Sequence, residues 1–187
     1  QVSEVDIYKM LHKKSSSIVK WILIISILEV LLWTGISLAY NSDEYFIKTH
    51  SEYLIEYFKY LTIFNYAVVA VFIYMFYKNY RAISTITSTK QLMKDILKTR
   101  KTVKYYVWYN LGMMVVSMII GFALVFTVDP KLHELTSKGN AMIFMIVFCT
   151  VCILVFVVLF WLFYRLIYGI LLRKLFRNYN ELKKIDL

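Results

Sequence analysis

Glu29 is the residue of this sequence whose type and position most clearly allow chemistry. It lies inside an apolar run, residues 21–40, that carries no other full charge. At about 1.5 Å per residue, a helix of that length crosses a hydrocarbon core of about 30 Å, where an ionised carboxylate is costly. We therefore expect either a protonatable or ion-binding group, or a buried polar side chain. In the second case Glu29 packs inward against Asn65, Ser26 or Ser117, or contacts another subunit.

Cys149 and Cys152 form a C-x-x-C pattern, and residues i and i+3 of a helix share a face. Four-span membrane proteins with this pattern are similar to thiol oxidoreductases of the vitamin K epoxide reductase type. Those enzymes also use a second cysteine pair in an outer loop, whereas this chain has two Cys in all. An apolar environment also disfavours the reactive thiolate. We therefore interpret both cysteines as small apolar core residues.

The remaining candidates for chemistry are histidines. His50 and His133 lie in polar links near acidic residues, and His12 stands alone on a basic segment. The spacing of the histidines matches no zinc or calcium pattern. The sequence contains no glycine-rich phosphate loop, no nucleophile elbow and no H-E-x-x-H motif. We therefore predict no enzyme activity, no cofactor and no metal site.

Glu29 also carries a family resemblance. A four-span chain with a glutamate in the middle of its first span resembles the small multidrug-resistance transporters. The resemblance implies proton-coupled transport that uses Glu29. It covers only the number of spans and this one residue, because those transporters are much shorter and have minimal loops. A small proton-coupled transporter is therefore the alternative function.

The composition indicates a membrane protein. Of 187 residues, 60% are hydrophobic and 18% aromatic, and the mean hydropathy is +0.60. Soluble domains are only about 45–50% apolar. A net charge of +10 would suggest nucleic acid in a soluble protein. Here the basic residues flank apolar segments, so membrane topology and anionic lipid headgroups explain them better. We therefore expect no nucleic-acid partner.

Four apolar segments predict a single all-α domain, residues 1–187, with four transmembrane helices in an antiparallel bundle. Capping boxes at Ser3–Asp6, Thr49–Glu52 and Ser88–Gln91 indicate helix starts. No breaker separates Thr89 from the third span, which predicts one helix of about 40 residues. The second, third and fourth helices should extend into the cytoplasm. The predicted spans are 18–40, 57–80, 103–128 and 141–168.

The positive charges predict the orientation. Lys and Arg concentrate before the first span, between the second and third, and after the fourth, which places both termini in the cytoplasm. With that topology, the chain should lie in a bacterial inner membrane. The aromatic residues support this orientation, because they gather where the two interfacial belts are expected. The inner belt comprises Trp21, Tyr77, Tyr80, Tyr105, Tyr106, Trp108, Trp161 and Tyr164, and the outer belt Trp33, Tyr40 and Tyr60.

Amphipathic segments flank the spans at 1–17, 89–104 and 169–187, and their apolar stripes are the predicted surface for a partner. The polar residues predicted inside the membrane are Glu29, Asn65 and Asn110. The partner-binding residues predicted from the stripes are Ile7, Met10, Leu11, Leu92, Met93, Ile96, Leu175, Phe176 and Tyr179.

The whole chain resembles uncharacterised small four-span inner-membrane proteins of bacteria, and its layout is similar to that of membrane-bound anti-sigma factors. Neither resemblance rests on a residue motif. The layout implies a cytoplasmic segment that holds a regulator. We therefore expect a non-enzymatic protein that binds another membrane protein or a cytoplasmic regulator, as accessory subunit or as anti-sigma type regulator. Anionic lipid headgroups are the other expected partner. The sequence is compatible with an oligomer as well as with a monomer.

Overall fold

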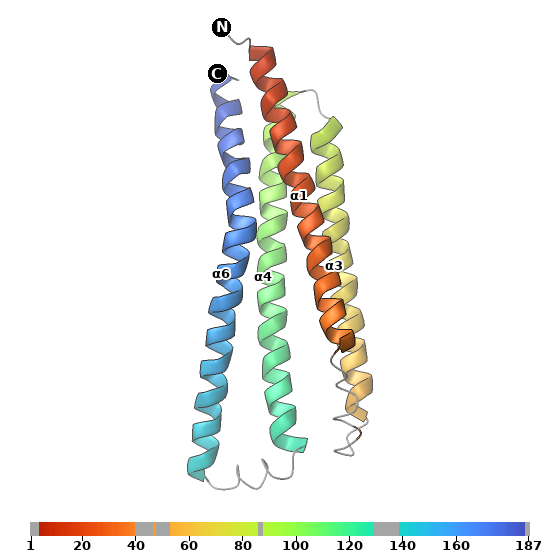
Figure 1. The fold of residues 1–187 in the computed structure, drawn as a ribbon, viewed down its shortest axis with the longest axis vertical. Coiled ribbons are helices and arrows are strands. Elements are labelled where there is room, and N and C mark those ends of the chain that lie inside the picture. The colour runs from red at the N-terminus through yellow and green to blue at the C-terminus, as the bar shows by residue number, and fades with distance from the viewer. Residues whose placement is uncertain (1–3, 40–46, 48–52, 86–87, 129–138, 186–187) are drawn as a thin grey trace.

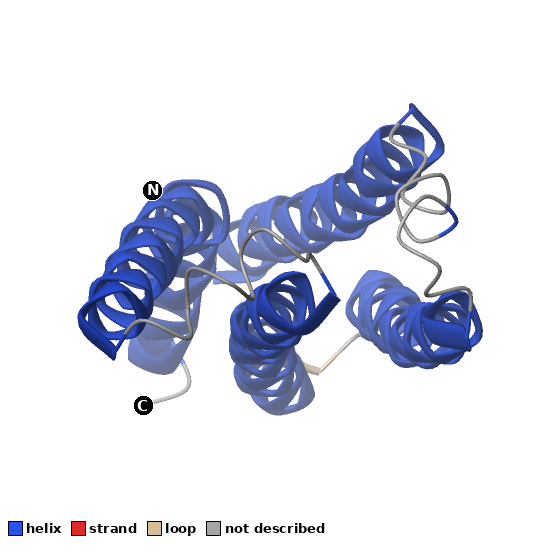
Figure 2. Cartoon of the chain, turned by 90° about the horizontal axis from the view of Figure 1, so that it is seen from below, coloured by secondary structure: helices blue, strands red, loops and turns tan. Residues whose placement is uncertain are grey.

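The computed structural model describes residues 4–39, 47, 53–85, 88–128 and 139–185, and the described chain is almost entirely helical (Figure 2). Four long helices make up the fold: α1 (Glu4–Ala39), α3 (Tyr53–Thr85), α4 (Thr89–Val128) and α6 (Gly139–Ile185). All four are long and apolar enough to cross a membrane. The all-helical fold with four candidate spans is therefore confirmed.

The helix bounds follow local sequence signals. The third helix in the chain, α4, begins at Thr89 and has 40 residues, as predicted. At its start the Leu92 N–H donates a hydrogen bond of 3.0 Å to the Ser88 carbonyl. The first helix, α1, continues without a break through Ser15–Ser17, so the N-terminal amphipathic segment and the first span are one helix. The predicted capping boxes at Ser3–Asp6 and Thr49–Glu52 include residues outside the described part of the chain.

The helices pack side by side, α1 against α3 and α6, and α4 against α3 and α6. Both termini lie at the same end (Figure 1). We call this the basic end, and it comprises residues 4–19, 78–85, 88–104 and 169–185. With a rise of about 1.5 Å per residue, α4 is about 60 Å long, about twice the thickness of a hydrocarbon core.

The basic end has its own apolar core. Its fully buried members come from all four helices: Leu11, Val19, Ile83, Leu92, Ile96, Leu175 and Leu182. Most of them lie beyond the predicted spans, where water makes the burial of each such side chain favourable by about 1.5–3 kcal/mol. The apolar stripes of the amphipathic segments therefore cover one another.

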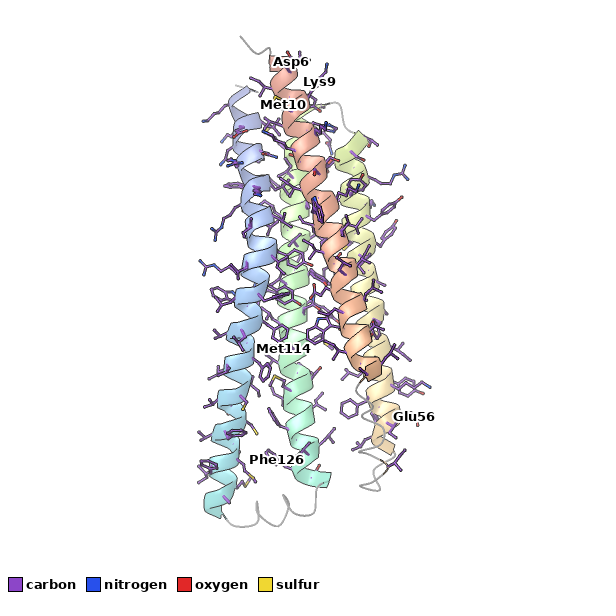
Figure 3. All side chains as sticks on the ribbon, viewed as in Figure 1. Asp6, Lys9, Met10, Glu56, Met114 and Phe126 are labelled. Carbon is purple, nitrogen blue, oxygen red and sulfur yellow. The ribbon has the colours of Figure 1, made fainter. Side chains whose placement is uncertain are left out.

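A second core lies further along the helices and is rich in aromatic rings. Its buried residues are Ile22, Val69, Phe76, Val103, Tyr106, Leu111, Tyr164 and Tyr168. Beyond it the packing thins: in α6, residues 142–163 are mostly exposed, and Cys149 is the one buried side chain in that stretch. The far half of the four helices thus presents mainly apolar side chains outward (Figure 3).

Candidate functional site

Glu29 is held inside the aromatic core by tyrosines from two other helices. Its side chain is 9% exposed. Tyr106 of α4 donates a hydrogen bond of 2.9 Å to Oε2, and Tyr168 of α6 donates one of 3.1 Å to the same oxygen. Tyr164 of α6 donates to Oε1. We call these four residues the Glu29 cluster.

Helix periodicity and ring packing position the cluster. Tyr164 and Tyr168 are four residues apart, so they lie on one face of α6, and their rings stack with centroids 5.9 Å apart. The Tyr106 ring meets Tyr168 edge-on at 5.9 Å and Phe76 edge-on at 5.4 Å. These edge-to-face contacts fix the rings, so that the hydroxyl groups converge on one carboxyl group.

The partners of Glu29 differ from those suggested by the sequence. Ser26 donates to the carbonyl of Leu23 at 2.8 Å, and Asn65 accepts a bond of 3.1 Å from Tyr109. The interpretation of Tyr106 and Tyr164 as interfacial belt residues was wrong, because they are 1% and 4% exposed. Their hydroxyl groups donate hydrogen bonds to the buried carboxyl group of Glu29. The i, i+4 pair of Tyr164 and Tyr168 near the end of the predicted fourth span was the sequence signal for this role.

The third predicted intramembrane polar residue, Asn110, lies one turn beyond Tyr106 and donates a hydrogen bond of 2.9 Å to its carbonyl oxygen. It also lines a cavity of about 300 Å³ together with Tyr164 and Ser117. The structure therefore brings Asn110 close to the Glu29 cluster, whereas Asn65 pairs with Tyr109 on the α3–α4 side.

A larger cavity, of about 910 Å³, lies between α1 and α6. Glu29 and Tyr168 form its polar wall, and the Trp33 and Phe160 rings, 5.6 Å apart, line both this cavity and the smaller one. Leu31 and Leu159 at its rim are 62% and 55% exposed, so the cavity opens toward the apolar outer face. The other lining residues are Ile25, Leu28, Leu32, Phe163 and Ile167.

The predicted partner-binding residues lie mainly inside the basic end. Leu11, Leu92, Ile96 and Leu175 are at most 2% exposed, and the others that pack on that core are Ile7, Met93 and Tyr179. Met10 and Phe176 remain exposed, at 53% and 38%. The Arg100 guanidinium lies 4.0 Å from the Phe176 ring centroid. Partner binding by these residues stays a prediction.

Polar contacts also occur inside the basic end. Asn178 donates a hydrogen bond of 3.0 Å to the Ser15 hydroxyl oxygen, and Asn79 donates one of 3.3 Å to that of Thr102. His12 Nε2 lies 2.7 Å from the carbonyl oxygen of Ile83. These bonds join different helices, so they help to fix the register in which the helices pack.

The other candidates for chemistry lie apart from the Glu29 cluster or outside the described residues. Cys149 and Cys152 are free cysteines. The described residues contain no group of three or more His, Cys, Asp or Glu residues that could hold a metal ion. His50 and His133 lie outside the described residues.

The chain matches a known family. The model of a family described as a domain of unknown function, DUF8845, matches residues 5–187, nearly the whole chain. No curated protein and no solved structure matches. The match defines a family without assigning an activity.

Proposed function

The chain belongs to the DUF8845 family, and we propose that it is a non-enzymatic integral membrane protein that binds a protein partner at its basic end. In this proposal the helices form an antiparallel bundle in a bacterial inner membrane, with both termini in the cytoplasm. The protein then acts as an accessory subunit of a membrane complex or as a regulator of anti-sigma type.

One observation carries the proposal: the helices continue past the length that a membrane requires and enclose a second core. A pure anchor does not need this additional length of packed helix, which is about 30 Å in α4. Because the apolar stripes are used internally, the surface offered to a partner is charged. Its exposed cations are Lys9, Lys13, Lys14, Lys78, Arg81, Lys90, Lys94, Lys98, Lys101, Lys104, Arg173, Lys174, Arg177, Lys183 and Lys184.

This surface favours a partner with an acidic face, because complementary charge speeds encounter and rejects other partners. Cations nearer the predicted membrane surface, such as Lys104 and Arg165, are suited to anionic headgroups. The Arg165 guanidinium lies 4.9 Å from the Trp161 ring centroid, an arrangement typical of interfacial anchors.

Charge reversal on one face of α4 tests the proposal. Lys94, Lys98 and Lys101 are exposed and share a face, being spaced by four and three residues. We expect a specific protein to copurify with the wild type from native membranes and to be lost when all three are changed to Glu. Lys59→Glu, exposed near the opposite end on α3, is the control and should retain it. Retention by the triple variant, or no specific partner, contradicts the proposal.

The second candidate is the small proton-coupled transporter. The observation that favours it is the position of Glu29, which lines a cavity open to the apolar outer face while tyrosine hydroxyls bind it from the inside. If this function holds, Glu29→Gln abolishes a proton-coupled flux in reconstituted vesicles, while Glu56→Gln, exposed at the end of the molecule away from the termini, leaves it unchanged. A flux that survives Glu29→Gln contradicts this candidate.

A further inference from the structure

Arg100 of α4 is a cation whose hydrogen-bond donors have no acceptor within the described helices. Its guanidinium lies 4.0 Å from the centroid of the Phe176 ring of α6, and no hydrogen bond or ion pair of the described residues adds to this contact. Nε is fully buried without an acceptor, whereas the two Nη nitrogens keep access to the surface. A guanidinium carries five N–H donors in a planar fork. Arg100 can therefore bind an acceptor group that comes from outside these helices.

Two more cations lie one helical turn from the contact between Arg100 and Phe176. Lys104 follows Arg100 by four residues on α4, and Arg173 precedes Phe176 by three residues on α6. Residues at these spacings are neighbours on a helix surface, and α4 packs against α6. Both cations are exposed, and both lie on the side of the contact that faces the predicted spans. Arg100, Lys104 and Arg173 thus form one group, which we call the Arg100 cluster.

The positive charge of the Arg100 cluster is not compensated by acidic residues of the same two helices. In the described part of the chain, the acidic residues of α4 and α6 are Asp95 and Glu181. Each lies five residues from the contact, on the side away from the predicted spans. No member of the cluster forms an ion pair within the described helices. A ligand with negative charge would therefore reduce the repulsion among the three cations.

The depth of the cluster matches the headgroup layer of a bilayer. The third predicted span begins at residue 103 and the fourth ends at residue 168. Along the helix axes, Arg100 and Arg173 therefore lie about 5 Å and about 8 Å beyond the hydrocarbon boundary. A headgroup layer extends about 5–8 Å beyond the hydrocarbon core on each side. Exposed apolar side chains within the spans, such as Trp108 and Leu166, offer a surface to acyl chains.

We propose that the Arg100 cluster binds the phosphate group of an anionic glycerophospholipid where α4 and α6 pack together. The Nη groups of Arg100 donate hydrogen bonds to the phosphate oxygens, and the Phe176 ring holds the planar fork in place. Lys104 and Arg173 add positive charge on the side of the spans. A zwitterionic lipid fits less well, because the same cations repel its ammonium group. The inference rests on the membrane insertion in the proposed function but not on a protein partner.

Native mass spectrometry of the detergent-solubilised full chain tests the site. The probes are phosphatidylglycerol and phosphatidylcholine with the same acyl chains. We expect the first phosphatidylglycerol to bind at least about 10-fold tighter than phosphatidylcholine, as charge-assisted hydrogen bonds predict. Arg100→Gln should weaken the binding of phosphatidylglycerol by a similar factor. Arg81→Gln, at an exposed position of α3 one residue beyond the second predicted span, is the matched control and should bind as the wild type does.

A second variant leaves the contact between Arg100 and Phe176 intact. Arg173→Gln removes an exposed cation and should weaken the binding of phosphatidylglycerol by about 2–5-fold, as for an exposed ion pair. Inorganic phosphate distinguishes a lipid from a soluble ligand with the same chemistry. It should not displace phosphatidylglycerol at concentrations at which the lipid saturates the protein, because it has no acyl chains to pack on the spans.

Four results would overturn the proposal: equal affinity for the two lipids, unchanged affinity in Arg100→Gln, an equal loss in Arg81→Gln, or displacement by inorganic phosphate at these concentrations. If Arg100→Gln does not fold, the Arg173→Gln and Arg81→Gln pair decides, and equal binding by these two variants overturns the site. Because no protein partner is present in this measurement, its result is independent of the copurification experiment that tests the proposed function.

Discussion

Tyr168 on α6 donates a hydrogen bond of 3.1 Å to Oε2 of Glu29 on α1, across 139 residues of sequence. This bond, with those of Tyr106 and Tyr164, ties the first helix to the third and fourth described helices at one buried point. Between apolar helices in lipid, hydrophobic burial gives little preference for one arrangement, so a polar contact of this kind helps to select it.

The effect of removing the Tyr168 hydroxyl should depend on whether Glu29 is present. In the wild type, we expect Tyr168→Phe to lower the free energy of unfolding by about 1 kcal/mol, which lies between typical values for bonds in membranes and bonds to charged groups. In a Glu29→Ala background the hydroxyl has lost its acceptor, so the same change should be neutral or stabilising. Denaturation in mixed micelles, followed by circular dichroism, measures this coupling.

The control for this comparison of single and double variants is Tyr109→Phe. It removes a hydroxyl that donates its hydrogen bond to Asn65 and not to Glu29. Its effect should add to that of Glu29→Ala, because the two pairs share no hydrogen bond. Additive effects of Tyr168→Phe and Glu29→Ala would show that their hydrogen bond is not energetically important.

The core of the basic end should be sensitive to truncation. Leu92 is fully buried in a cluster formed by all four helices. Leu92→Ala therefore leaves a cavity and should cost about 2–5 kcal/mol. Leu97, on the same helix, is 42% exposed, and Leu97→Ala should cost less than about 1 kcal/mol. Thermal unfolding in detergent compares the two, and equal losses would mean that this core does not stabilise the protein.

The sequence predicted the helices well and the contacts between them poorly. The start of α4 at Thr89 and its length follow from local signals, which need no knowledge of the other helices. The role of Tyr164 depends on what faces it across the fold, and its place near the inner end of a span suggested a lipid interface instead. The stripe through Leu92 and Ile96 showed correctly which face is apolar, but not that other helices of the same chain cover it.

The buried pair of Ser15 and Asn178 should set the register between α1 and α6. Asn178 is 3% exposed and Ser15 is 0% exposed, with 3.0 Å between Nδ2 and Oγ. Asn178→Ala leaves the Ser15 hydroxyl without this partner and should cost about 1–3 kcal/mol. The double change Asn178→Leu and Ser15→Ala replaces both groups by apolar ones and should recover much of the loss. If the double variant unfolds as easily as the single one, the cost comes from packing and not from the hydrogen bond.

The orientation proposed from the positive charges can be tested with single cysteines in a Cys149→Ala, Cys152→Ala background. Met10 lies at the basic end and Tyr57 lies near the opposite end, next to Glu56, and they are 53% and 70% exposed (Figure 3). Since Lys and Arg favour the cytoplasmic side, a membrane-impermeant maleimide should label Tyr57→Cys in intact spheroplasts and Met10→Cys only in inverted vesicles. Detergent-solubilised protein, in which both cysteines should react, is the control for accessibility. The reverse labelling pattern would place the basic end outside the cytoplasm, where no cytoplasmic regulator could reach it.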